Sequence, residues 1–107
     1  MDSPSLPIGV QVENEEAIVL APVGEVDVFT SIDLRLLIAE LLSYEPPHVV
    51  VDLGRVSFAD CAGLGVLVDA ARQLHSYGGR LTIRGTTDLQ RMILRVIRVP
   101  KMVPLLP

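Results

Sequence analysis

The first part of the chain alternates between hydrophobic and polar residues. Residues 10–13 alternate strictly, and polar residues 14–16 separate them from the apolar stretch AIVLAPV. A two-residue period interrupted by a polar turn predicts a β-hairpin. Pro22 lies inside the apolar stretch and has no N–H to give to a sheet. We therefore expect its strand to end there, to lie at an edge or to carry a bulge.

Two later segments repeat apolar residues with the spacing of a helix. The first follows Thr30 and is ended by prolines 46–47, whereas the second begins near Asp60 or Cys61 and is ended by glycines 78–79. Proline cannot continue a helix, and glycine commonly terminates one. The apolar faces are expected to hold Leu34, Leu37, Ile38, Leu41 and Leu42 in the first helix, and Leu64, Leu67, Val68, Ala71 and Leu74 in the second.

A third helix is predicted after Thr87, because Thr87 and Gln90 match a capping box. Its apolar face is expected to hold Leu89, Met92, Ile93, Val96 and Ile97. A basic stripe on the opposite side consists of Arg91, Arg95 and Arg98. Such a stripe is typical of the solvated face of an amphipathic helix, and contact with an acidic protein, a membrane surface or RNA is the alternative.

The segments between the helices predict the sheet. HVVVDL at 48–53 is apolar almost throughout, which favours a central strand covered on both faces, and RLTIR at 80–84 predicts another strand. The segment GRVSFAD at 54–60 is expected to be a short loop. Alternation of strands and helices favours parallel pairing with right-handed crossovers. We predict an α/β fold in which a small mixed β-sheet of four to five strands is backed by helices.

Length and composition restrict this fold further. A chain of 107 residues is expected to form a single domain over 1–107, with a loose lead-in at 1–7 and an irregular tail at 100–107. In that tail, MVPLL is expected to add a short edge strand or to pack loosely. Hydrophobic residues make up 50% and aromatic residues 4%, so the core must be aliphatic, and nucleic-acid stacking is not expected.

Charge and cysteine content bear on partners and location. Residues 1–71 carry 2 basic and 12 acidic side chains, a net of −10, while residues 72–107 carry 7 basic and 1 acidic, a net of +6. This charge separation can orient a binding partner during encounter, but it does not identify the partner. A single cysteine and no signal-like segment favour the cytoplasm. No apolar run reaches the roughly 18 residues that span a bilayer, so membrane insertion is not expected.

Candidate chemistry concentrates where the second helix begins. Asp60 and Cys61 lie at its N-terminus, where free N–H groups attract anions, and Gly63 and Gly65 remove side chains from its first turns. Asp60 is expected to cap the helix, and Asp27 to be a turn residue. No third ligand joins them in a metal-binding pattern, and no nucleophile–base pair is present, which predicts a non-enzymatic protein without cofactor or metal. Cys61 is either a redox-sensitive thiol or a small half-buried residue.

Two motifs in this chain resemble a known family. VVVDLGRVSFADCAGLGVLVDAARQLHSYGGRLTI and the upstream GEVDVFTSIDL are similar to the signatures of STAS domains, in particular bacterial anti-sigma-factor antagonists, over about residues 8–99. The resemblance implies a small mixed sheet backed by helices. It also implies binding to an anti-sigma factor, which is often a serine kinase as well, and release of a sigma factor for transcription, as in a stress response. The rival expectation is a STAS regulatory subunit of a lipid or anion transport assembly.

The chain departs from that family at its switch. Family members usually read Asp-Ser-Ser-Gly-Leu-Gly, and the first serine is phosphorylated, whereas this chain has Cys61 and Ala62 at the two serine positions. The resemblance implies a partner-binding site formed by Asp27, Asp60, Cys61, Ala62, Gly63, Leu64 and Gly65. We therefore predict an antagonist without the usual phosphorylation switch. Ser57, Thr30 and Ser31 are the alternative phosphate acceptors, and no pattern specifies an oligomeric state.

Overall fold

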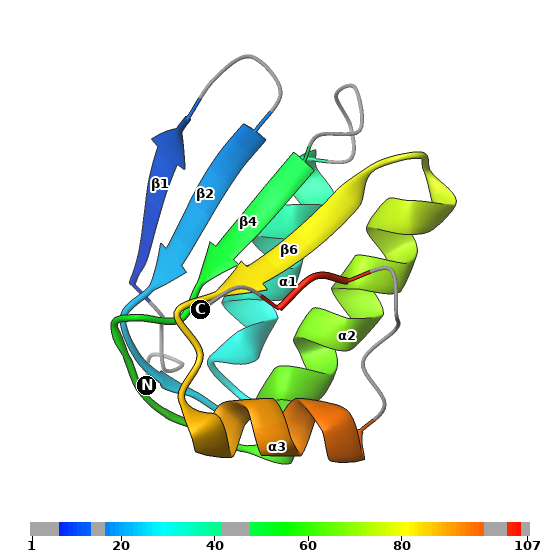
Figure 1. Cartoon of the computed structure of the whole chain (residues 1–107). Coiled ribbons are helices and arrows are strands. Elements are labelled where there is room, and N and C mark those ends of the chain that lie inside the picture. The colour runs from blue at the N-terminus through cyan, green and yellow to red at the C-terminus, as the bar shows by residue number, and fades with distance from the viewer. Residues whose placement is uncertain (1–6, 14–16, 42–47, 98–102, 106–107) are drawn as a thin grey trace.

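The computed structural model describes residues 7–13, 17–41, 48–97 and 103–105. Within these ranges, the chain opens with a hairpin, and each helix follows one or more strands (Figure 1). The helices are α1 (Ser31–Leu41), α2 (Cys61–Ser76) and α3 (Asp88–Val96). The strands are β1 (Ile8–Val12), β2 (Ala17–Pro22), β3 (Gly24–Val26), β4 (His48–Asp52), β5 (Val56–Ala59) and β6 (Arg80–Arg84).

The main sheet has four strands in the order β1-β2-β4-β6. The hairpin β1–β2 is antiparallel, and the pairs β2–β4 and β4–β6 are parallel, as expected for strands connected by helices. The predicted hairpin, the end of its second strand at Pro22 and the central position of the apolar strand at 48–52 are confirmed. The predicted fold class, a mixed sheet backed by helices, is also confirmed.

A second, two-stranded sheet joins β3 and β5 in parallel. The prediction of a loop over 54–60 is wrong at this point, because Val56–Ala59 forms a strand. Four residues whose outer two members are buried and whose inner two are exposed give no alternating signal. β3 leads into α1 through the turn at 27–30, and β5 leads into α2 through Asp60.

Helices α1 and α2 cover one face of the main sheet, and α3 lies across one end of the molecule (Figure 1). The core between them is aliphatic, built from Leu, Val, Ile and Ala, as the composition predicted. Every residue on the predicted apolar face of α2 is buried. On α1, Leu34 and Ile38 are buried and Leu37 and Leu41 are partly buried, while Leu42 lies outside the described residues.

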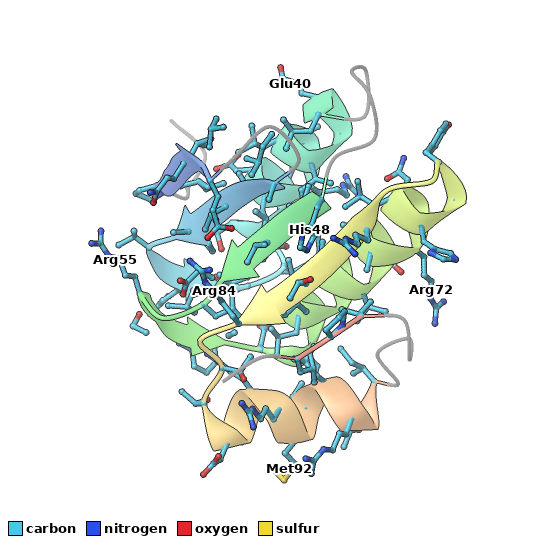
Figure 2. All side chains as sticks on the ribbon, turned by 45° about the horizontal axis from the view of Figure 1, so that its top comes forward. Glu40, His48, Arg55, Arg72, Arg84 and Met92 are labelled. Atoms are coloured by element: carbon cyan, nitrogen blue, oxygen red, sulfur yellow. The ribbon has the colours of Figure 1, made fainter. Side chains whose placement is uncertain are left out.

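Helix α3 has the predicted capping box but a different buried face. Thr87 accepts a hydrogen bond from the Gln90 N–H at 3.1 Å, and the Gln90 side chain accepts one from the Thr87 N–H at 2.9 Å. Gln90 and Leu94 are the buried residues of α3. The prediction that Leu89, Met92 and Val96 would be buried is therefore wrong, and Met92 points away from the body of the protein (Figure 2). Ile93 and Ile97 are partly buried.

The C-terminal tail covers the β6 edge of the main sheet. Leu105 forms a parallel bridge with Ile83, the Ile83 N–H donates to the Pro104 carbonyl at 3.0 Å, and Val103 is buried. The predicted attachment of this tail to a sheet edge is thus observed as a single bridge. Among the described residues, no helix is long and apolar enough to span a membrane.

Candidate protein-binding site at the start of helix α2

Asp60 caps helix α2, as predicted. Its backbone is extended, its side-chain Oδ1 accepts a hydrogen bond from the Gly63 N–H at 2.7 Å, and its carbonyl accepts one from the Leu64 N–H at 2.9 Å. The cap satisfies part of the unpaired N–H set at the helix start. The first turn, with Cys61 and Ala62, is thereby held in a defined position.

Gly63 allows α2 to begin directly against strand β3. A Cβ atom at this position would lie 2.2 Å from the Val26 carbonyl oxygen, a separation that no side chain tolerates. The Asp60 N–H donates to the same carbonyl at 3.3 Å. These contacts bring the two sequence motifs together, because Val26 immediately precedes Asp27.

Gly65 differs from Gly63 in its surroundings. Apart from its chain neighbours and the backbone of its own helix, a Cβ atom here would meet no atom of the described residues within 4 Å. Glycine inside a helix costs roughly 0.5–1 kcal/mol relative to alanine, yet packing within this chain does not require it. The described part of the fold therefore does not need a glycine at position 65.

Asp27 organises the turn between β3 and α1. Its Oδ1 accepts hydrogen bonds from the N–H groups of Thr30 and Phe29, both at 2.9 Å, and its carbonyl accepts one from the Ser31 N–H at 3.0 Å. The Thr30 hydroxyl donates to the Glu25 carbonyl at 2.7 Å and accepts from the Asp27 N–H at 3.0 Å. The Thr30 N–H, followed by that of Phe29, holds the pKa of Asp27 below its ordinary value. The predicted turn role is confirmed.

The predicted partner-binding residues differ in exposure. Cys61 and Ala62 are exposed, Asp27, Asp60 and Gly65 are half-buried, and Gly63 and Leu64 are buried. The Leu64 side chain belongs to the core, so it positions the helix instead of offering a contact surface. The exposed part of the predicted site is thus the outer side of the first turn of α2, beside the Asp27 turn.

Sequence reasoning missed the two phenylalanines beside this site. Phe29 lies in the Asp27 turn with 66% of its surface exposed, and Phe58 lies on β5, two residues before Asp60, with 54% exposed. They are the only phenylalanines in the chain. A core built without rings leaves both on the surface, and aromatic residues are enriched in protein interfaces. The sequence signal for them is the low aromatic content: a core predicted to be aliphatic leaves the few aromatic side chains for the surface.

Other candidate groups have structural roles or lie elsewhere. In the part of the chain that the structure describes, no group of three His, Cys, Asp or Glu side chains is placed to hold a metal ion. His48 Nε2 lies 2.7 Å from the Thr82 hydroxyl, linking β4 to β6. Asp52 pairs with Arg84 at 3.0 Å on the sheet face opposite the helices, and both residues line a pocket of about 320 Å³. These groups do not join the α2 site.

Solved structures of known proteins share this fold. An anti-sigma factor antagonist from Mycobacterium paratuberculosis superposes with a TM-score of 0.78 at 24% identity, over 95% of this chain and 86% of that one. The anti-sigma factor antagonist SpoIIAA in its unphosphorylated form gives 0.73 at 18% identity, over 94% and 87%. The Bacillus cell fate determinant SpoIIAA in the phosphorylated form gives 0.71 at 18% identity, over 92% and 90%.

The sequence itself matches a family model. This model is described as "Mlab, STAS domain", and it matches residues 10–106. The matched range contains the Asp27 turn, the start of α2 and the strands that carry them. The chain therefore belongs to the STAS domain family.

Proposed function

We propose that this protein is an anti-sigma-factor antagonist, a non-catalytic domain that binds an anti-sigma factor and so leaves a sigma factor free. Membership of the STAS family and the shared fold with two structures described as anti-sigma factor antagonists support this role. The observation that carries the proposal is the exposed first turn of α2, which Asp60 caps and which packs against the residue preceding Asp27.

The thiol of Cys61 stands where the family resemblance expects a phosphorylated serine. A phosphoserine brings about −1.5 to −2 charges at neutral pH, beside the carboxylates of Asp27 and Asp60. Cysteine and the following Ala62 offer no hydroxyl to a serine kinase. We therefore expect the docking surface to keep the charge of the unphosphorylated state.

The burial of two nearby hydroxyls argues against them as alternative phosphate acceptors. Ser31 is fully buried, and Thr30 is buried with its hydroxyl engaged in the Asp27 turn. Ser57 is exposed on β5, so among these three it is the one that a kinase can reach. Phosphate on Ser57 would point to a relocated switch.

The partner can be identified by affinity capture from the cytoplasm of the source cells. Chemical cross-linking, purification and mass spectrometry should recover an anti-sigma factor, whose binding can then be measured by calorimetry. Substitution Cys61→Asp should abolish that binding, because it places a charge at the first turn, whereas the neutral Cys61→Ala should retain it. Equal affinity of the two variants would remove Cys61 from the interface. Recovery of a membrane transport subunit instead would support the transport alternative.

The kinase reaction provides the second test. The captured anti-sigma factor, if it is a kinase, should transfer no phosphate from labelled ATP to the wild-type chain, while Cys61→Ser should become an acceptor. Labelling of wild type would contradict the missing switch. A Ser57→Ala variant would then show whether Ser57 carries the phosphate.

A further inference from the structure

The two edges of the main sheet differ. At the β6 edge, the tail supplies a backbone partner through Pro104 and Leu105. At the opposite edge, within the ranges that the structure covers, no strand pairs with the outer side of β1 (Figure 1). An edge strand presents a row of backbone donors and acceptors to any strand that can reach it.

The hydrogen bonds of the hairpin define which groups face outward. The Val23 N–H donates to the Pro7 carbonyl at 2.8 Å, and the Glu13 N–H donates to the Ala17 carbonyl at 3.0 Å. In an antiparallel pair, such bonded positions alternate with positions whose N–H and C=O point the other way. The odd-numbered residues of β1 therefore direct their backbone N–H and C=O groups toward β2. Ile8, Val10 and Val12 direct theirs outward, away from β2.

The side chains of these residues also form an apolar row. Val10 pairs with the buried Leu20, so its side chain lies on the helix-covered face, yet 57% of Val10 and 70% of Val12 are exposed. The segment IGVQV contains no charge, no proline and three β-branched residues. Natural edge strands usually carry Lys, Pro or a bulge to prevent pairing. This edge carries none of them.

We propose that β1 pairs antiparallel with β1 of a second copy of this chain. The two main sheets then form one continuous sheet across this junction. With Val10 opposite Val10 of the second copy, Ile8 lies opposite Val12, and the outward N–H and C=O groups of all three residues meet. The same register joins the apolar rows of the two chains. The two Glu13 side chains lie at opposite ends of the junction, so no like charges meet.

A second copy fits this edge because the strand is self-complementary. A two-fold axis through Val10 pairs the outward N–H and C=O groups of both strands at once. The same surface is then used on both chains, which defines an isologous interface. The contact is small beside the ~1,600 Å² that standard interfaces bury. The dimer is therefore expected to form with protein concentration and to dissociate on dilution.

Sedimentation equilibrium over a wide concentration range tests the proposal. Wild type should show a monomer–dimer equilibrium. Val10→Pro removes an outward N–H and no N–H that bonds to β2, and it should weaken association about tenfold or more. Val10→Lys places like charges at the axis and should do the same. Leu89→Lys changes an equally exposed residue on α3, 57% in each case, and should leave association unchanged.

Disulfide trapping tests the register in a Cys61→Ala background. Directly opposed residues of a hydrogen-bonded pair have Cα atoms about 5.5 Å apart, within the range of a disulfide. Val10→Cys should therefore cross-link with itself rapidly, whereas Gln11→Cys, which would lie opposite Gly9, should not. A wild-type chain that stays monomeric at all concentrations would overturn the proposal, as would association that survives both Val10 variants or that Leu89→Lys abolishes.

Discussion

Single residues of the predicted binding site differ in whether the fold depends on them. Gly63 and the Asp60 N–H contact the Val26 carbonyl and so join the start of α2 to β3. Asp27 holds its own turn by accepting hydrogen bonds from the Thr30 and Phe29 N–H groups. Gly65 makes no contact that requires a glycine. The fold thus requires a glycine at position 63, and the described residues do not require one at position 65.

We expect alanine at these two glycines to have opposite effects on stability. Gly63→Ala forces a methyl group against the Val26 carbonyl and should lower the free energy of unfolding by about 1–3 kcal/mol. Gly65→Ala should raise it by about 0.5–1 kcal/mol, because alanine favours the helix. Urea unfolding followed by circular dichroism measures both values. A similar loss in both variants would contradict the contact at Val26.

The exposed phenylalanines should contribute to binding and not to folding. Phe29→Ala and Phe58→Ala are each expected to weaken binding to the captured anti-sigma factor about tenfold or more, while the urea midpoint stays nearly unchanged. Tyr77→Ala is a matched control, because Tyr77 is similarly exposed but lies at the far end of α2. Loss of binding in the tyrosine variant alone would relocate the interface.

At the scale of elements, the helical and strand periods of the apolar residues were sufficient to predict the hairpin, the central strand, α1 and α2. They failed for β5, whose four residues are too few to show a period, and for the orientation of α3. The apolar residues of α3 occupy a wider arc than the side of the helix that packs against the rest of the protein. Only the tertiary contacts determine that Leu94 is the apolar residue that becomes fully buried. The partner-binding positions came from a family motif, whereas the exposure of Phe29 and Phe58 depends on which strands meet.

The orientation of α3 can be tested by alanine substitution. Leu94→Ala removes a fully buried side chain and should lower the free energy of unfolding by about 2–5 kcal/mol. Met92→Ala, two positions earlier on the exposed side, should change it by less than about 0.5 kcal/mol. Chemical denaturation of both variants gives the comparison. Equal losses would support the face that the sequence predicted instead.

At the scale of the whole molecule, acid should destabilise the protein in two separate pH ranges. Burial, followed by the charge of Arg80, lowers the pKa of His48 below 6.5. The unfolded chain therefore takes up this proton more readily, and stability should fall as the pH drops through the unfolded pKa, then level off below the folded pKa. Asp27 and Asp52 have lowered pKa values, so their contribution is lost only as the pH falls below 3.8.

A histidine variant separates the two ranges. In His48→Gln, the urea midpoint should vary less than in wild type between about pH 7.5 and pH 5, because the titrating group is gone. The further decline at lower pH should persist in both proteins. An unchanged slope in the variant would assign the upper range to another group.

The lone, solvent-facing sulfur atom of Cys61 also makes the native chain its own reporter. A maleimide dye has one thiol to attack in each molecule, and it would attach at the predicted docking surface without any engineered handle. A small, environment-sensitive dye there should change its emission when a protein covers it. A bulky adduct at the same atom should instead obstruct docking, which makes probe size a direct gauge of how closely the partner approaches.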